Sequence, residues 1–139
     1  MKSKEQNKEQ NKELKRKYLE FQILMQQVNQ IQQQISTINN NVLELKDLSN
    51  NLEKIKGLKK DKEVLIPIGS NIFIKGSIKD SENVIMGIGS NVLKEKTVEE
   101  SQKAINEQVQ ELENITSELD LTLNETLKRL ESLEKELRE

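Results

Sequence analysis

Cysteine, histidine and tryptophan are absent from this 139-residue chain, which has one proline, five glycines and three aromatic residues. Without cysteine it can form neither a disulfide nor a thiolate metal site. Without histidine a serine has no imidazole base to activate it. The longest apolar run, residues 64–68, contains Pro67 and is too short to span a bilayer. We therefore expect no enzymatic activity, no cofactor, no bound metal and no membrane partner.

The charges are balanced and the hydrophobic content is low. The chain has 22 basic and 24 acidic residues, a net charge of −2, and 33% hydrophobic residues. This near-balance gives no general attraction to nucleic acid. The N-terminus lacks the apolar stretch of a signal peptide, so we expect a cytoplasmic protein. Because a compact core needs more apolar side chains, the composition favours an elongated helical fold that buries a narrow seam.

The spacing predicts a coiled-coil helix over residues 14–57, after a polar tail at residues 1–13 that is either disordered or a solvated extension of the helix. Apolar residues recur at alternating steps of four and three, the spacing of a coiled-coil seam. The regular part of this seam comprises Leu24, Val28, Ile31, Ile35, Ile38, Val42 and Leu45. Leu14, Tyr18 and Phe21 precede it, and Leu48, Leu52 and Ile55 follow it. Each junction then has two consecutive steps of three, which predicts local overwinding. Gly57 is expected to end the helix in a left-handed conformation.

A second coiled-coil helix is predicted over residues 98–138. Thr97 and Glu100 have the spacing of a capping box, in which a hydroxyl and a carboxylate satisfy free backbone donors. From Val98 the four–three spacing continues unbroken through positions 102, 105, 109, 112, 116, 119, 123, 126, 130, 133 and 137. Gln102, Thr116 and Thr126 are the polar members. Polar residues in a seam weaken packing but penalise wrong registers.

The two seams match when the chain folds back on itself. If Gly57 lies opposite Thr97, paired residue numbers sum to 154, and Leu52 then faces Gln102. A shift by a whole heptad would also match, but it would leave the helix ends staggered. The pattern therefore predicts an antiparallel coiled coil within one chain.

Between the helices, residues 63–97 form a β-type block that repeats itself. Ile68-Gly69-Ser70-Asn71 returns as Ile88-Gly89-Ser90-Asn91. Gly and Asn tolerate positive φ, so each repeat is expected to be a hairpin turn. The four strands are expected at about 63–69, 71–79, 84–89 and 91–97. The residues expected on the assembly face are Val64, Ile66, Ile68, Ile72, Ile74, Ile78, Val84, Met86, Ile88 and Val92.

Isolated hairpins bury too little surface to be stable alone, and their open edges invite pairing with another chain. Pro67 cannot donate to a β-ladder, so its strand is expected at an edge or a bulge. The predicted fold class is mainly α with small β: a long antiparallel two-helix coiled coil with two β-hairpins inserted at the bend. Oligomerisation through the hairpins follows from this prediction.

Several stretches of the block resemble the prefoldin alpha subunit of archaeal type. They are VLIPIG at 64–69, FIKG at 73–76, IKD at 78–80, VIMGIG at 84–89, and Lys94–Thr97 followed by VEE at 98–100. Two hairpins mark the alpha class of that family. The resemblance implies helical tentacles hanging from a β-barrel platform, in a hexamer of two alpha and four beta subunits. It also implies an ATP-independent chaperone, a holdase that captures unfolded polypeptides and delivers them to a group II chaperonin. Gamma-type relatives form filaments, so a structural, filament-forming subunit is the alternative.

The end of the coiled coil far from the hairpins is the predicted contact site for unfolded clients. A coiled coil frays near its ends, and flexible or aromatic side chains suit promiscuous contact. The candidate residues are Leu14, Tyr18, Phe21, Met25, Leu127, Leu130, Leu133 and Leu137. The alternative is that these residues only close the seam within the chain. That interpretation is favoured for Leu130 and Leu133, and it is evenly balanced for the residues near the irregular spacing or off the strict seam.

Overall fold

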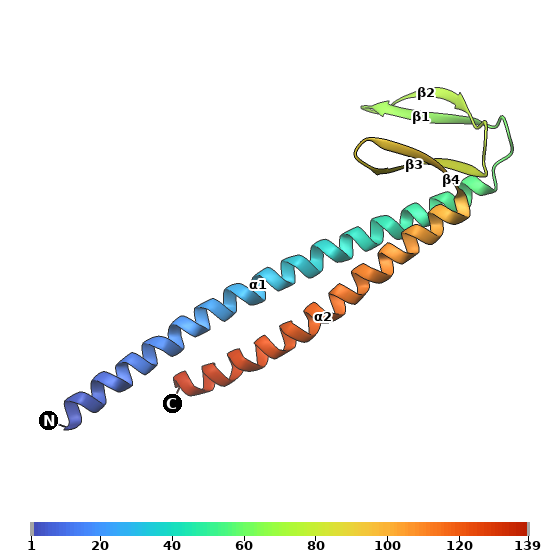
Figure 1. Ribbon diagram of the computed structural model, residues 1–139. Helices are drawn as coiled ribbons and strands as arrows, with labels where there is room; N and C mark the ends of the chain where they lie inside the picture. Colours follow the sequence, from blue (N-terminus) through green and yellow to red (C-terminus); the bar gives the residue numbers. More distant parts are fainter. Residues whose placement is uncertain (1, 139) are drawn as a thin grey trace. The chain divides into compact units, whose positions relative to one another are not determined.

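Two long helices enclose four short strands in the sequence of this chain (Figure 1). The computed structural model describes residues 2–138. Its elements are α1 (Lys2–Lys56), β1 (Glu63–Gly69), β2 (Ile72–Ser77), β3 (Asn83–Gly89), β4 (Val92–Thr97) and α2 (Val98–Arg138). The predicted fold class is confirmed. Within the described residues, neither helix has an apolar stretch long enough to cross a bilayer.

The chain divides into two compact units, and both helices contribute to each. The terminal unit comprises Met1–Asn40 with Glu113–Glu139, and the hairpin unit comprises Asn41–Leu112. In each unit α1 and α2 lie side by side and run antiparallel, as the matching seams predict (Figure 1).

The predicted seam residues of α2 are shielded from solvent in the structure. All the predicted seam positions from Val98 to Leu137 are buried or half-buried. Leu133 in the terminal unit and Val98 in the hairpin unit are fully enclosed. The hydroxyl of Thr97 accepts a hydrogen bond of 3.0 Å from the backbone N–H of Glu100, which is the N-cap half of the predicted capping box.

α1 departs from the prediction on both sides of its regular seam. Tyr18 and Leu48 are exposed, while their neighbours Lys17 and Ser49 are half-buried. The four–three spacing thus continues through two polar positions, and the predicted overwinding is wrong. α2 offers an unbroken four–three seam, and a facing helix must keep the same phase to pack against it. Lys17 is tolerated there because its stem can pack while its Nζ lies 3.6 Å from the carboxylate of Glu136.

Gln102 fixes the register of the helices in the hairpin unit. Its Nε2 donates to the carbonyl oxygen of Ser49 at 3.2 Å and to Oε2 of Glu53 at 2.8 Å. Those residues lie on either side of Leu52, the residue predicted to face Gln102. The small side chain of Ser49 leaves room in the seam for the glutamine to reach its carbonyl.

The two ends of α1 also differ from the prediction. The helix begins at Lys2 rather than Leu14, so the polar segment from there onward is the solvated extension and not a disordered tail; Met1 lies outside the described residues. At the other end Gly57 does not adopt a positive φ. Its N–H donates to the carbonyl of Lys54 at 3.3 Å. A bond to the third residue back tightens the last turn and occupies a free carbonyl, so the expected left-handed ending is wrong.

The two hairpins repeat one geometry. Residues 63–69 pair antiparallel with 72–77, and residues 83–89 pair with 92–97. Both ladders have an irregularity just before the turn, between Pro67 and Gly69 in the first and between Gly87 and Gly89 in the second. The prediction that Pro67 lies at an edge or a bulge is confirmed, since its strand is one of only two in its sheet.

The turns explain the repeated Gly-Ser-Asn motif. Ser70 and Asn71 have φ of 45° and 62°, and the matching residues of the second turn have 48° and 62°. Positive φ at both central positions defines the two-residue type I′ turn, whose twist matches that of the strands. Gly69 has φ of 131°, a conformation that side chains other than hydrogen rarely adopt. The predicted hairpin turns are confirmed.

Candidate functional site

The residues expected on the assembly face of the hairpins remain largely open in the structure. Six are exposed and four are half-buried; the exposed ones are Ile66, Ile68, Ile72, Ile74, Ile88 and Val92, and the half-buried ones are Val64, Ile78, Val84 and Met86. Ile66 pairs with Ile74 across the ladder, so these side chains share a face. Ile78 was expected in a strand, but β2 ends at Ser77. Its N–H and carbonyl instead bond the loop that follows α1, at Lys62 and Asp61.

The opposite face of each hairpin is also apolar and open, which the sequence prediction missed. Leu65 and Phe73 lie there in the first hairpin, and Ile85 and Leu93 in the second. Ile85 is 72% exposed and Leu93 69%. The signal was present in the near-continuous apolar letters of each strand, which are typical of strands buried on both faces. Each hairpin therefore offers two apolar faces to a partner.

Every strand of the hairpins has an unpaired edge. Each sheet contains two strands, β1 with β2 and β3 with β4. One row of backbone N–H and C=O groups on each strand is consequently not used by the sheet, and such rows pair readily with another strand. Open edges combined with two apolar faces make residues 63–97 a surface suited to assembly.

The terminal unit sorts the predicted client-contact residues into two groups. Leu130 and Leu133 are buried in the seam, and Phe21 and Leu137 are half-buried. The exposed group comprises Leu14, Tyr18, Met25 and Leu127. Leu19 and Ile23 are exposed as well and were not predicted. The structure thus separates residues that close the seam from apolar residues that face outward.

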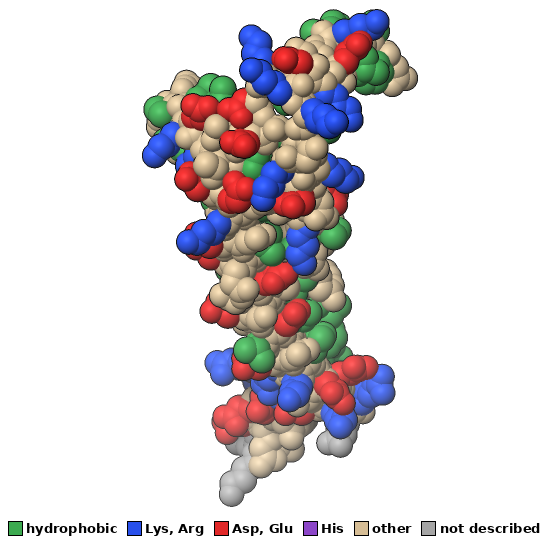
Figure 2. All heavy atoms as spheres, turned by 90° about the vertical axis from the view of Figure 1, so that its right-hand side faces the viewer, with side chains coloured by type: hydrophobic (Ala, Val, Ile, Leu, Met, Phe, Trp, Pro, Cys, Tyr) green, Lys and Arg blue, Asp and Glu red, His purple; other side chains and the backbone are tan. Residues whose placement is uncertain are grey.

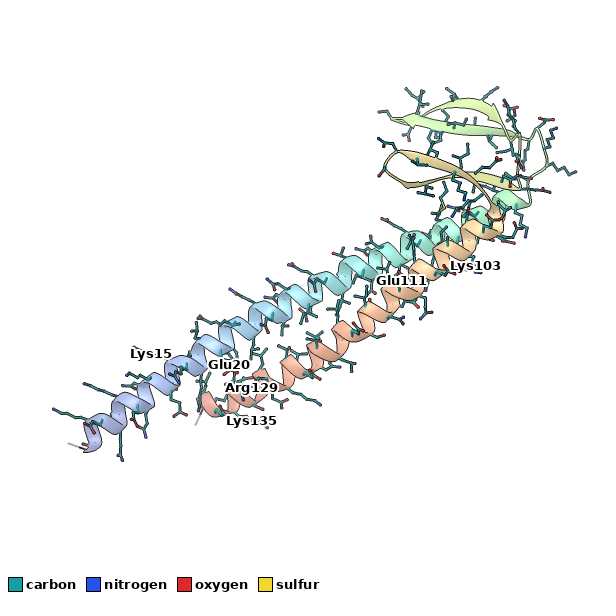
Figure 3. The ribbon with its side chains drawn as sticks, in the orientation of Figure 1. Lys15, Glu20, Lys103, Glu111, Arg129 and Lys135 are labelled. Atoms are coloured by element: carbon teal, nitrogen blue, oxygen red, sulfur yellow. The ribbon has the colours of Figure 1, made fainter. Side chains whose placement is uncertain are left out.

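Ion pairs close the seam near the ends of the terminal unit, where the sequence suggested fraying. Arg129 binds Glu20 with two parallel hydrogen bonds, Nε to Oε1 at 2.9 Å and Nη2 to Oε2 at 3.2 Å (Figure 3). These bonds lower the pKa of Glu20 and raise that of Arg129, against a smaller opposing effect of desolvation. In the structure these apolar side chains face outward on an intact helix pair, so their exposure does not require fraying.

A similar pair closes the hairpin unit. Nζ of Lys56 lies 2.8 Å from Oε1 of Glu99, joining the last turn of α1 to the first turn of α2. Their hydrogen bond raises the pKa of Lys56 and lowers that of Glu99. The carboxylate also lies near a helix N-terminus and the ammonium near a C-terminus, the arrangement that helix dipoles favour.

The family model described as prefoldin subunit matches residues 24–139, which cover both helices and both hairpins. The chain belongs to the prefoldin family. Its resemblance to the alpha subunit, first indicated by the hairpin block, is confirmed by relatives that bear that name. The prefoldin family consists of chaperone-type subunits and is not a class of enzymes.

Two methanococcal prefoldin subunits illustrate the similarity. Prefoldin subunit alpha 1 of Methanocaldococcus jannaschii is 30% identical over 123 residues, covering 88% of this chain and 78% of the relative. Prefoldin subunit alpha of Methanococcus aeolicus is 31% identical over 126 residues, covering 91% and 85% respectively.

The fold is also that of a solved prefoldin. The filamentous PFD of Methanocaldococcus jannaschii, determined by cryo-EM, superposes with a TM-score of 0.76 over 86% of this chain and 98% of that chain, at 22% identity.

Proposed function

We propose that this chain is the alpha-type subunit of an ATP-independent holdase that works in the cytoplasm. Its hairpins would assemble with beta-type prefoldin subunits, two alpha with four beta, and its helix ends would hold unfolded polypeptides. The complex would then deliver these clients to a group II chaperonin. Family membership and relatives named prefoldin subunit alpha support this proposal.

The observation that carries the client-binding step is the set of outward apolar side chains in the terminal unit. Tyr18, Met25 and Leu127 are exposed although the seam beside them is closed by Leu130 and Leu133. Exposed apolar side chains on the same part of a helix pair do not stabilise the chain in water. An unfolded polypeptide that covers them would remove this apolar surface from water. If the helix pairs of several subunits contact one client, their weak individual contacts add up to a much higher overall affinity.

Aggregation of a chemically denatured protein, followed by light scattering, tests this step. We expect Tyr18→Ser with Leu127→Ser to weaken the suppression of aggregation by the assembled complex. The control is Leu43→Ser with Leu121→Ser, which removes two apolar side chains that are more exposed than Tyr18 and Leu127 but lie farther from the start of α1 and the end of α2. Equal protection by wild type and both variants, with assembly intact, would refute capture at the helix ends.

A filament-forming subunit is the second candidate function. The structural similarity to a filamentous PFD favours it, as do two hairpins that each present two apolar faces. A sizing experiment separates the candidates: the hexamer requires added beta-type prefoldin subunits, whereas a filament grows from this chain alone.

A further inference from the structure

Neither helix carries a lysine or arginine along the middle of its length. α1 has none between Lys17 and Lys46, and no charged residue at all between Glu20 and Glu44. α2 has none between Lys103 and Lys128. The acidic residues of that stretch of α2 are Glu107, Glu111, Glu113, Glu118, Asp120 and Glu125. Figure 2 shows a stretch of the helix pair where acidic and hydrophobic side chains appear without basic ones. A polypeptide that supplies positive charge would find no competing cation within these stretches.

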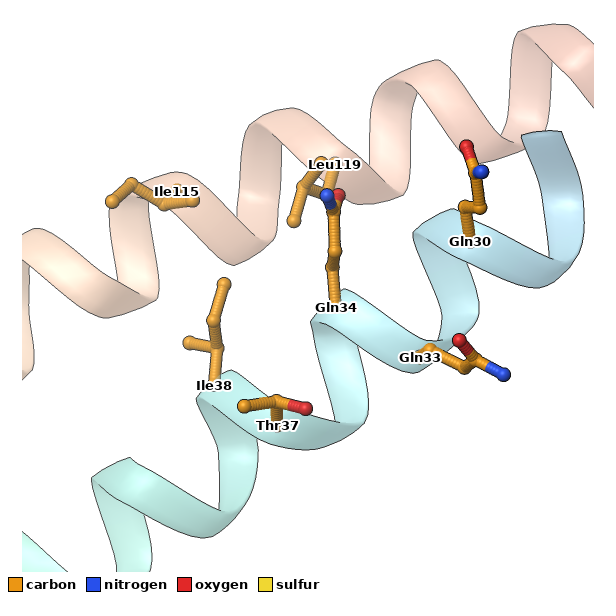
Figure 4. Close-up of a pocket in the computed structure, with 7 residues that line it drawn as sticks. All are labelled: Gln30, Gln33, Gln34, Thr37, Ile38, Ile115 and Leu119. Carbon is orange, nitrogen blue, oxygen red and sulfur yellow. The ribbon is translucent and has the colours of Figure 1, made fainter.

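A groove of about 800 Å³ lies between the helices of the terminal unit. Its lining is Gln30, Gln33, Gln34, Thr37 and Ile38 from α1, with Ile115 and Leu119 from α2. Gln34 and Ile38 point toward α2, where Gln34 lies beside Leu119 and the side chain of Ile115 lies along the helix (Figure 4). The groove thus combines an apolar floor with a row of amide side chains.

This lining matches the chemistry of an extended peptide. A glutamine amide both donates and accepts hydrogen bonds, as does each peptide group of an unfolded chain. Ile115 is exposed, so it offers apolar surface to a client side chain. Glu118 and Glu125 lie three and ten residues after Ile115 in the same helix, so helical periodicity puts all three on one side of α2. Both carboxylates are exposed and border that side.

We propose that this groove binds extended client segments in which apolar residues alternate with lysine or arginine. The proposal rests on the proposed holdase function and narrows its substrate class: the exposed residues near the helix ends hold apolar segments, and the groove selects basic ones. Charge complementarity identifies the occupant, because a basic segment that covers the exposed Ile115 is attracted to Glu118 and Glu125 on the same side of α2, the pair that we call the rim. An acidic segment would meet like charges there with no cation on the same stretch of either helix.

The test uses two unstructured fluorescent peptides with identical apolar residues, one with lysines and one with glutamates between them. Fluorescence anisotropy with the assembled full-length chain measures both affinities. We expect the lysine peptide to bind more tightly, and Glu118→Gln with Glu125→Gln to reduce that preference about fivefold, the effect of two solvent-exposed charge contacts. Raising the salt concentration should reduce the preference in wild type in the same direction. Ile115→Ser should weaken both peptides alike, since it removes apolar floor and no charge.

The matched control is Glu113→Gln with Asp120→Asn, which removes the same charge from the other side of the seam. Retention of the lysine preference in this control, together with its loss in the rim variant, supports the proposal. An equal fall in both variants would mean that general acidity attracts the peptide, and the groove proposal would be wrong. It would be equally wrong if neither peptide is preferred. The rim variant should still suppress the aggregation of a client without basic segments. This separate measurement tests the holdase proposal independently of the groove proposal.

Discussion

Two leucines on α2, six residues apart, allow the stability of the helix pair to be separated from the proposed client binding. Leu133 is 0% exposed in the seam and Leu127 is 43% exposed beside it. The two substitutions Leu133→Ala and Leu127→Ala remove the same atoms from the same helix, and alanine is a good helix former at both places. Any difference between the variants therefore comes from the surroundings of each side chain.

The expected magnitudes follow from burial. A leucine truncated in a closed core costs 2–5 kcal/mol, and a two-helix seam relaxes more easily than a globular core, so about 2–3 kcal/mol is expected for Leu133→Ala. Leu127→Ala should cost about 0.5 kcal/mol or less, as an exposed substitution does. With a urea dependence of about 1–2 kcal/mol per molar, the first change lowers the unfolding midpoint by about 1–3 M.

Urea unfolding followed by circular dichroism measures these midpoints at one fixed protein concentration, because assembly contributes to apparent stability. Suppression of aggregation is then measured below the unfolding range of both variants. We expect Leu127→Ala to lose protection while it keeps the wild-type midpoint, and Leu133→Ala to keep protection while it loses stability. If Leu127→Ala lowered the midpoint as much as Leu133→Ala, the outward placement of Leu127 would be refuted. If it kept both stability and protection, the client-contact role of Leu127 would be refuted.

Three further predictions concern an ion pair and two glycines. Because Arg129 holds the pKa of Glu20 below its ordinary 4.5, the pair stabilises above that pH and is lost as the pH falls through the lowered value. The difference in melting temperature between wild type and Glu20→Gln should consequently shrink on acidification. Gly76→Ala should destabilise the first hairpin by about 1 kcal/mol or less, because its Cβ would lie 2.7 Å from Cδ1 of Ile66 and this exposed side chain would have to rotate away. Gly69→Ala should cost about 1–3 kcal/mol in melting experiments, because φ there is 131°.

Each of these changes has a control within the chain. Ile66→Val removes the atom that the new methyl group would meet, so it should rescue Gly76→Ala in a double-mutant cycle; strictly additive effects would contradict the contact. Gly57→Ala has no positive φ to strain and should be neutral or slightly stabilising. For the ion pair, a pH-independent difference between wild type and Glu20→Gln would show that its charge contributes nothing.

The seam of α2 could be predicted in full because its pattern is regular, whereas that of α1 could not. Reading α1 by its apolar letters alone placed Tyr18 and Leu48 in the seam. Their neighbours Lys17 and Ser49 take those places, since facing helices must stay in phase layer by layer. The facing helix decides whether Leu48 or Ser49 packs in the seam. The apolar spacing of α1 alone carries no information about that helix.

The hairpins show the same dependence on a partner. Their turns were predictable because Gly69, Ser70 and Asn71 leave few other conformations. Only one apolar face of each hairpin was predictable, since alternation along a strand indicates Ile66 and its neighbours but not the exposed Leu65 on the opposite face. A strand whose two faces are both covered by other chains has no polar face. The residues that would cover the second face belong to a partner, so the sequence of this chain does not include them.

The absence of basic residues along the middle of both helices also determines where proteases can cut. Trypsin cleaves after lysine and arginine, so α1 offers it no site between Lys17 and Lys46, and α2 none between Lys103 and Lys128. Limited digestion with trypsin would therefore cut near the chain termini and in the loops around the hairpins. The central stretches of both helices would remain as long resistant fragments. An endoprotease specific for glutamate would cut α2 within its central stretch while sparing the facing stretch of α1 between Glu20 and Glu44. Cleavage by these two enzymes distinguishes the helices without any engineered site.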